Sequence, residues 1–189
     1  MIYCNLSGLM ATKKVNISTV SRDTGISRTT LTGLYYNNFK GIQLDTLNVL
    51  CRYFNVTTEK MLIFSRYDID VKFNFFNSDH IDFEELPEQV ISVIDFEISV
   101  GEIKRTVSTC CTLYLHWSNN SVSIEADLEY YEPTTSEEQD ENCFLKKAIS
   151  SLSVELRAYI ESLVVDEILK EYGSNFGDRE TDISLCMNI

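Results

Sequence analysis

The sequence predicts an α+β protein in two segments: an all-helical one over residues 1–64, then an antiparallel β-sheet over residues 65–189 that C-terminal helices cover. Apolar residues recur at helical spacings of three and four in the first segment, and with the two-residue period of strands from Asp68 onward. The charge divides as well. The first segment has seven Lys and Arg and three Asp and Glu, a net charge of +4. The second has nine Lys and Arg and 26 Asp and Glu, a net charge of −17, and the two together give the net charge of −13. Only the first segment therefore has the sign that suits phosphates.

Five short helices are expected in the first segment. The first ends near Lys13 and Lys14, where the negative end of the helix dipole favours cations. Asn16 is the expected N-cap of the second helix, and Gly25 closes that helix in the left-handed conformation of a tight turn. Ser27 is the expected N-cap of the third helix. The inward-facing side chains are expected to be Leu6, Leu9, Met10, Val20, Leu31, Leu34, Tyr35, Leu47, Leu50, Cys51, Phe54, Met61 and Leu62.

Two short helices joined by a tight glycine turn, with a polar outer face on the second, make a helix-turn-helix. The stretches NISTVSRDTGISRTTL, from residue 16, and IQLDTLNVLCRYFNVTTEKML, from residue 42, resemble the phage-repressor class of DNA-binding domain, also called Cro/cI or XRE. Helix order, turn glycine and inward positions all agree with that class over residues 1–64.

The resemblance implies which residues meet DNA. The second helix would rest its N-terminus on a phosphate, and the third would enter the major groove N-terminus first. Arg28 would read a guanine through O6 and N7, while Thr29 and Thr32 would reach a thymine methyl or form single hydrogen bonds. The full set of expected DNA contacts is Asn16, Ile17, Ser18, Ser27, Arg28, Thr29, Thr32, Gly33, Tyr36, Asn37 and Lys40, with Asn38 a further backbone candidate.

Three departures from the family pattern weaken the expected reader. Ile17 stands where the family often has glutamine, and Gly33 stands where a long side chain is common. Glycine there costs the helix about 1 kcal/mol relative to alanine. Tyr36-Asn37 replaces a common asparagine-glycine ending. An alternative interpretation is that the fold is kept for protein contacts and DNA binding is lost.

In the second segment, alternating apolar and polar residues predict four antiparallel strands with one buried and one exposed face. Residues 118–121, Ser-Asn-Asn-Ser, have the composition of a hairpin turn. The expected inward residues are Ile69, Val71, Phe73 and Phe75, then Ile94, Phe96, Ile98 and Val100, then Val107, Thr109, Cys111, Leu113, Leu115 and Trp117, and finally Val122, Ile124, Ala126 and Leu128.

Helical patterns over residues 144–172 supply a cover for the buried face, after an acidic stretch over 132–142 that is expected to be a mobile loop. The apolar stripe of these helices is wider than four strands require, which predicts a homodimer. Its expected contacts are Leu156, Tyr159, Ile160, Leu163 and Val164. Residues 173–189 show no clear period, and the topology of strands followed by a long helix resembles the SecB-like chaperone fold.

No pattern predicts catalysis, a cofactor or a metal. The six cysteines form no C-x-x-C pair, which is typical of a reduced, cytoplasmic protein, and no apolar run is long enough to span a membrane. His116 has no nucleophile pattern nearby, and Cys110 and Cys111 should point to opposite faces. An acidic cluster with one histidine matches no metal loop and is expected to be solvated: Asp79, His80, Asp82, Glu84 and Glu85.

Together these features predict a sequence-specific DNA-binding transcriptional regulator, a phage or mobile-element repressor that acts as a dimer on double-stranded DNA. The alternative is a protein inhibitor, such as an antitoxin or a phage-encoded antagonist of the anti-CRISPR kind. In that alternative the acidic second segment binds a partner protein while the first segment regulates its own gene. Sensing of a small molecule by the second segment is a third possibility that no residue set favours.

Overall fold

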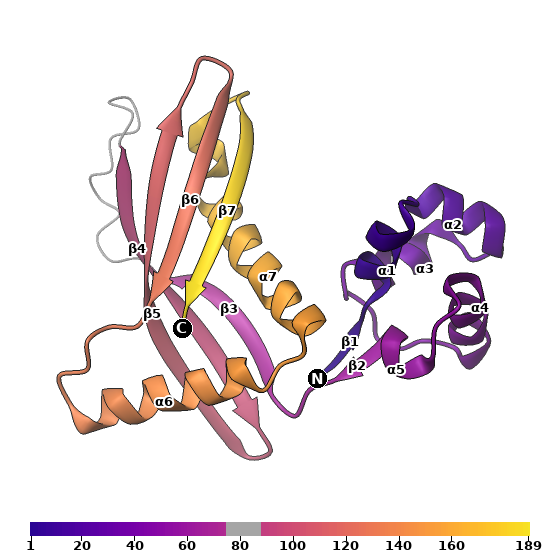
Figure 1. The fold of residues 1–189 in the computed structure, drawn as a ribbon, viewed down its shortest axis with the longest axis horizontal. Helices are drawn as coiled ribbons and strands as arrows, with labels where there is room; N and C mark the ends of the chain where they lie inside the picture. Colours follow the sequence, from indigo (N-terminus) through magenta and orange to yellow (C-terminus); the bar gives the residue numbers. More distant parts are fainter. Residues whose placement is uncertain (75–87) are drawn as a thin grey trace. The chain divides into compact units, whose positions relative to one another are not determined.

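The protein is described by a computed structural model that covers residues 1–74 and 88–189 and divides into two compact units, Met1–Arg66 and Tyr67–Ile189 (Figure 1). The first unit is helical and the second is built on a sheet, which confirms the predicted α+β class. Predicted residues Phe75, Asp79, His80, Asp82, Glu84 and Glu85 lie outside the described residues.

All five predicted helices are present in the first unit, which the structure describes throughout. They are α1 (Leu6–Lys13), α2 (Ile17–Thr24), α3 (Arg28–Tyr35), α4 (Leu44–Phe54) and α5 (Thr58–Met61). Their shared core joins every helix, because each contributes at least one side chain that is no more than 7% exposed. The core consists of Cys4, Leu6, Met10, Val20, Leu31, Leu34, Leu47, Leu50 and Met61.

A small sheet in the first unit was not predicted. Strand β1 (Ile2–Cys4) pairs antiparallel with β2 (Leu62–Phe64), so that Tyr3 lies opposite Ile63. Beyond the sheet, the backbone N–H of Ser65 donates to the Met1 carbonyl at 2.9 Å. This pairing closes the unit by joining its first residues to its last.

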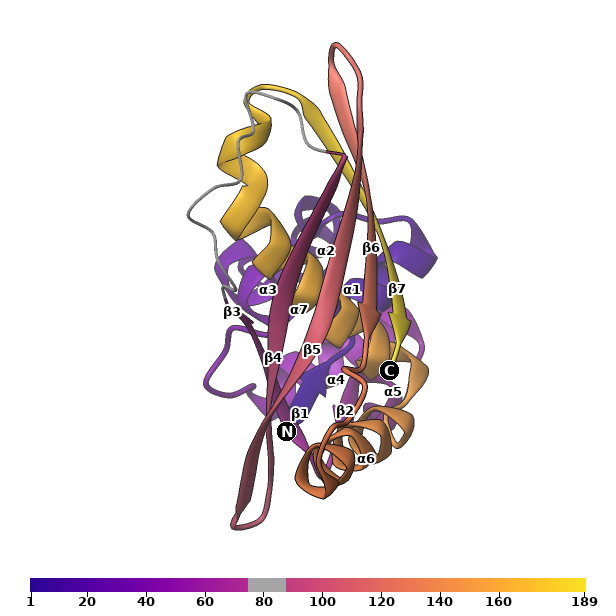
Figure 2. The ribbon, with the colours of Figure 1, turned by 90° about the vertical axis from the view of Figure 1, so that its left-hand side faces the viewer.

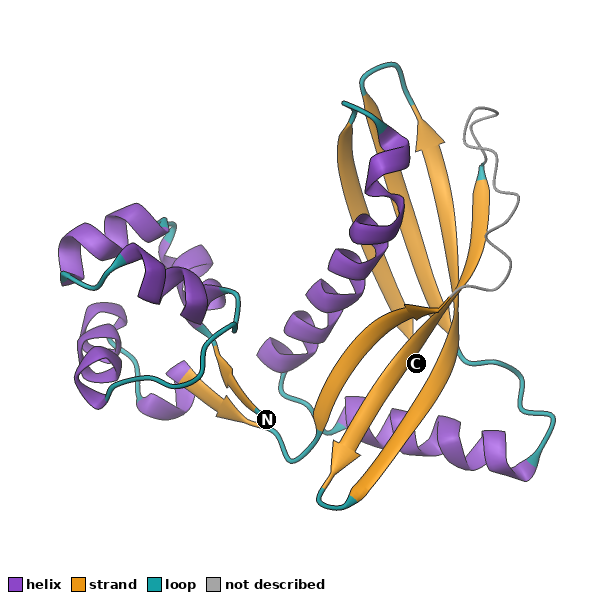
Figure 3. Ribbon diagram, turned by 180° about the vertical axis from the view of Figure 1, so that it is seen from behind, coloured by secondary structure: helices purple, strands orange, loops and turns teal. Residues whose placement is uncertain are grey.

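The second unit contains one five-stranded sheet among its described residues, where four strands were predicted (Figure 3). Strands β3 to β6 pair antiparallel in chain order, and β7 adds to β6 in parallel. Residues 173–189, for which the sequence showed no clear period, contain the whole of β7. The strands are β3 (Asp68–Asn74), β4 (Gln89–Val100), β5 (Ile103–Trp117), β6 (Ser121–Glu129) and β7 (Glu180–Asn188).

The acidic stretch over 132–142 is helical from Ser136 onward, so the expectation that it forms a loop is wrong for most of it. Helix α6 (Ser136–Ser150) begins with a capping box, in which the Glu138 amide donates to the Thr135 hydroxyl at 3.2 Å and the Thr135 amide donates to the Glu138 carboxylate at 3.2 Å. Because a capping box satisfies two free amides at a helix start, it stabilises a helix whose first turns are polar and exposed. Hydrogen bonds that the Thr134 amide and hydroxyl donate to the Glu138 carboxylate, at 2.7 and 2.9 Å, lower the pKa of Glu138, and those of Thr135 add to this effect.

Helix α7 (Val154–Tyr172) crosses one face of the sheet and is followed by a short 3₁₀ helix, Gly173–Phe176 (Figures 2 and 3). Leu156, Ile160 and Val164 are at most 1% exposed inside this unit. The unit itself therefore buries much of the expected stripe, although Leu169 on the same helix remains 37% exposed. Of the five residues expected at a dimer interface, Tyr159 and Leu163 are half-buried, and the other three belong to the core.

The two faces of the sheet have the predicted alternation. Cys111 is fully buried on the face that α7 covers, and burial raises the pKa of its thiol to about 12. Cys110 lies on the opposite face and is half-buried, so the adjacent thiols point apart as expected. On the covered face, the hydroxyls of Ser92 and Tyr172 lie 2.6 Å apart and join β4 to the end of α7.

Candidate nucleic-acid interface

The turn between α2 and α3 is fixed by its own hydrogen bonds. Gly25 has φ of +75° and ends α2, its amide donating to the Ser21 carbonyl at 2.9 Å. The Ser21 hydroxyl donates to the Ile26 carbonyl at 2.7 Å, across the turn. A side chain at Gly25 would strain the backbone, since the left-handed region costs other residues about 1–2 kcal/mol. The turn therefore sets the angle between the two helices.

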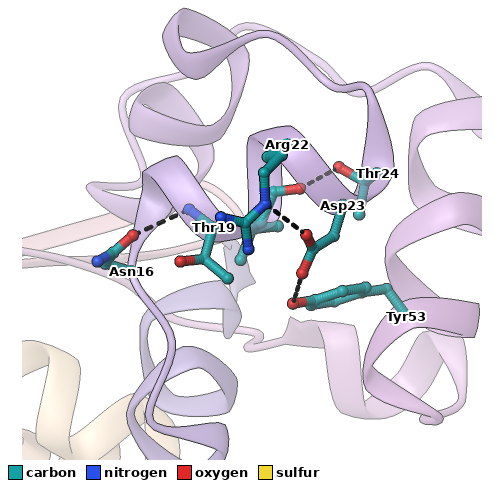
Figure 4. A network of polar contacts seen from close by, with 7 residues as sticks. Asn16, Thr19, Arg22, Asp23, Thr24 and Tyr53 are labelled. Carbon is teal, nitrogen blue, oxygen red and sulfur yellow. Dashed lines mark hydrogen bonds and ion pairs between the residues drawn. The ribbon is translucent and has the colours of Figure 1, made fainter.

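A polar network holds the end of α2 against α4 (Figure 4). The Asp23 carboxylate accepts from Tyr53 at 3.1 Å and pairs with Arg22 at 3.1 Å. Lys13 joins the network from α1, since its ammonium group donates to the Tyr53 carbonyl at 2.6 Å and lies 3.8 Å from the centre of that ring. The periodicity of the sequence gave no sign of this network, because its members lie as far as 40 residues apart.

The N-terminus of α3 is capped and presents polar side chains to solvent. The Thr30 amide donates to the Ser27 hydroxyl at 3.1 Å, as the sequence predicts. Leu31 and Leu34 are buried beneath the helix, whereas Arg28, Thr29 and Thr32 are exposed on its outer side. In the part of the chain that the structure describes, Arg28 forms no ion pair, so its guanidinium is available to a ligand.

The N-terminus of α2 lies beside the end of α3. Asn16 caps α2 by accepting from the Thr19 amide at 2.9 Å (Figure 4). An open hollow of about 530 Å³ separates the two helix ends, and its wall brings four of the expected DNA contacts together. The hollow is lined by Met10, Ala11, Val15, Asn16, Ile17, Ser18, Tyr35 and Tyr36.

Three of the expected DNA contacts have structural roles in this unit. The Asn37 side chain accepts from the Cys4 amide at 2.6 Å and donates to the Cys4 carbonyl at 3.2 Å, so both of its polar ends are occupied. Ile17 is half-buried and packs against the core. A Cβ atom added at Gly33 would lie 3.2 Å from the Asn38 carbonyl oxygen, because the chain after α3 doubles back over the helix.

The remaining expected contacts keep exposed side chains. Tyr36 is 65% exposed at the end of α3, and Lys40 is exposed in the loop that follows. Ser18 is exposed in the first turn of α2, where free amides and the helix dipole favour an anion. Ser27 combines an exposed position with its capping hydrogen bond.

Two helices held at a fixed angle, the second with a polar and cationic outer face, are the features of a helix-turn-helix that reads duplex DNA. The family model of the Cro/C1-type helix-turn-helix DNA-binding domain matches residues 5–65, which extend from the residue before α1 to the one after β2. The resemblance of the first segment to phage repressors is thus confirmed, and the protein is a DNA-binding regulator in general terms. No curated protein and no solved structure matches the chain, so the comparisons give the SecB-like resemblance no support.

The second unit offers less chemistry. Over residues 1–74 and 88–189, no three His, Cys, Asp or Glu side chains are grouped as metal ligands would be, and no helix is long and apolar enough to cross a membrane. His116 is exposed on the outer face of β5. That face also has a mainly apolar hollow of about 400 Å³ between β4 and β5, which the sequence analysis missed. It is lined by Ile91, Ser92, Val93, Ser108, Cys110 and Tyr131.

Proposed function

We propose that the protein is a sequence-specific transcriptional repressor of a phage or mobile element, and that it acts as a dimer on double-stranded DNA. The observation that carries this proposal is the capped N-terminus of α3, where exposed Arg28, Thr29 and Thr32 lie on a helix-turn-helix of the Cro/C1 type. Each of these side chains points away from the core that Leu31 and Leu34 help to form.

In the proposed complex, α3 lies in the major groove and Arg28 donates two hydrogen bonds to a guanine. A good bidentate pair of this kind discriminates against the wrong base by about 1–3 kcal/mol. The first turn of α2 lies against the DNA phosphate backbone at Ser18. Tyr36 and Lys40, which follow α3, also contact the phosphate backbone. The phosphate contacts fix the register, and the α3 side chains supply the sequence preference.

A dimer follows from how few readers one unit carries. With one arginine and two threonines on α3, a single first unit is expected to bind DNA with a dissociation constant near the non-specific range, roughly 10⁻⁴ to 10⁻⁶ M. Joining two first units makes the second binding event intramolecular, which raises the overall affinity without adding a new type of interaction. The acidic second unit would repel DNA that the first units do not bind specifically, which improves the discrimination of specific from non-specific sites.

The proposal is tested by comparing two arginine variants of the full chain. A duplex selected from a random pool is titrated with protein, and binding is followed by fluorescence anisotropy at fixed salt. Arg28→Ala is expected to weaken binding by about five- to 150-fold, the equivalent of 1–3 kcal/mol, and to relax the preference at one base. Arg52→Ala removes the same charge from an exposed position on α4 and serves as the control. Equal losses in the two variants would mean that α3 does not read the bases.

The inhibitor alternative is favoured by one observation, the apolar hollow on the outer face of the sheet. Ile91 is 62% exposed and Tyr131 is 41% exposed beside it, which leaves apolar surface on a unit that is otherwise acidic. Exposed apolar patches often mark protein contacts. Under this alternative, Ile91→Asp would abolish the biological effect of the protein and leave its affinity for DNA unchanged. Under the repressor proposal the same variant retains repression.

A further inference from the structure

Strand β7 ends the sheet and lacks the usual protection of an edge. In the described part of the chain it pairs with β6 alone, along all nine of its residues. Its sequence, ETDISLCMN, contains no proline and no lysine, the residues that most often keep an edge strand from pairing with another chain. The opposite edge, β3, carries charges along most of its length, at Asp68, Asp70 and Lys72, whereas the charges of β7, Glu180 and Asp182, lie only in its first three residues. The two edges therefore differ, and β7 is the one suited to a further strand.

The backbone groups that face outward follow from the register. The Glu180 amide donates to the Asn120 carbonyl at 2.9 Å, and Glu180 lies opposite Ser121 in the parallel ladder. In a ladder of this kind, alternate residues direct both backbone groups to the same side. The even-numbered residues of β7 thus bond to β6. The odd-numbered residues, Thr181, Ile183, Leu185 and Met187, present their N–H and C=O groups at the open edge.

The side chains of the same residues leave an apolar seam at this edge. Ile183, Leu185 and Met187 lie beside Ile124, Ala126 and Leu128, which are buried on the face that α7 covers. The three β7 side chains are only half-buried, because no strand lies beyond them. A further strand would cover them and would satisfy the outward backbone groups at once.

We propose that β7 pairs antiparallel with β7 of a second copy of this chain, about a two-fold axis. The proposal rests on the dimer of the proposed function and identifies its surface. Two five-stranded sheets then join into one continuous sheet of ten strands. Pairing of this kind is isologous, since each strand offers the same groups to the other, and it closes at two copies.

Charge along the strand selects the register in which two copies pair. Centring the axis on Ser184 pairs all nine residues, and it places Glu180 opposite Asn188 and Asp182 opposite Cys186. Centring it on Asp182 would instead place two carboxylates face to face, which is destabilising. The acidic end of β7 thus meets the uncharged end of its copy. On the covered face, Ile183 of each copy then lies opposite Leu185 of the other copy.

Cross-linking tests the register directly. In the proposed dimer, Ser184 faces itself at a position without inter-strand hydrogen bonds, where Cα atoms are about 4.5 Å apart. That separation is close enough for a disulfide, which needs roughly 4.4–6.8 Å. Ser184→Cys, made in a chain whose Cys110, Cys143 and Cys186 are serine, is expected to give mostly covalent dimer under mild oxidation. Ser123→Cys in the same background is exposed one strand further in and should stay monomeric on a non-reducing gel.

A second measurement follows the dimer without cross-linking. Sedimentation velocity of the full chain is expected to show a dimer that Leu185→Lys and Leu185→Pro each weaken at least tenfold. Proline is tolerated where the missing amide faces outward, so this variant should keep its pairing with β6. Ser123→Lys adds the same charge on β6 and should remain a dimer. Trp117 fluorescence checks that each variant is folded.

The outcomes separate the two proposals. A wild-type dimer that resists the Leu185 variants and does not cross-link through Ser184→Cys would overturn the β7 surface and leave the dimeric repressor standing. A wild-type chain that is monomeric at micromolar concentration would overturn both the surface and the dimer. Equal cross-linking of Ser184→Cys and Ser123→Cys would mean random collision, and it too would contradict the pairing.

Discussion

Replacing Asn37 by alanine should destabilise the first unit. This residue follows α3 with φ of +55°, and its side chain forms both hydrogen bonds to the Cys4 backbone, at 2.6 and 3.2 Å. Cys4 is fully buried in β1 and lies opposite Leu62 of β2, while its backbone N–H and C=O bond to Asn37. The Asn37 side-chain amide thus bonds to β1 as a third strand would, and it links the end of α3 to the start of the chain.

The cost can be estimated from these contacts. Leaving a buried donor or acceptor without a partner costs about 1–3 kcal/mol, and the left-handed backbone adds about 1 kcal/mol when asparagine becomes alanine. Asn37→Ala is therefore expected to lower the free energy of unfolding of the first unit by about 2–4 kcal/mol. Asn37→Gly loses the same hydrogen bonds without the backbone strain, so its loss should be about 1 kcal/mol smaller.

Hydrogen exchange of the full chain, read by mass spectrometry, measures this loss where it occurs. Amides of α3 and β1 should exchange faster in Asn37→Ala, while the chain's single tryptophan, Trp117, reports that the second unit is unchanged. Stability of Asn37→Ala within about 0.5 kcal/mol of the wild type would refute the reasoning, since that is the size of an ordinary surface substitution.

Three further predictions follow from the contacts described. Residues 1–66 should fold alone, because their core is complete, but should bind the selected duplex at least tenfold more weakly than the full chain; equal affinity at equal salt would exclude the avidity argument. Thr135→Ala should cost about 0.5–2 kcal/mol of α6 stability, measured by exchange of its first-turn amides, and unchanged exchange would count against the capping box. The pKa of Glu138 is lowered in the folded chain, so its contribution is present above pH 4.5 and should be lost as the pH falls through the folded value. Glu138→Gln should remove this pH dependence, and a dependence that persists in that variant would assign it to another group.

The features that could be predicted from the sequence are those that local interactions determine. Asn16 and Ser27 each accept from an amide three residues later, and Gly25 needs only its own backbone conformation, so each is visible in a short stretch of sequence. The exposed reading side chains of α3 follow from the same periodicity that buries Leu31 and Leu34. Their contact with DNA stays a prediction.

The features that were not predicted depend on residues far apart in the sequence, or on short sequence signals that had not been used. Strands β1 and β2 have three residues each and pair across about 60 residues of chain, and the role of Asn37 depends on that pairing. Strand β7 needs α6 and α7 as its crossover, although Ile183, Leu185 and Met187 do alternate with polar residues. The Thr135–Glu138 capping box was also present in the sequence and could have identified the start of α6.

Selection of binding sites from a random duplex pool by the full chain tests the central claim most directly. The account predicts an inverted repeat whose half-sites are about one helical turn, 34–36 Å, apart or a multiple of it, as a two-fold pair of α3 helices requires. Each half-site should contain a guanine whose preference Arg28→Ala removes. A pool that shows no enrichment over random sequence, at a salt concentration where the protein binds DNA, would contradict the assignment of α3 as a reader of bases.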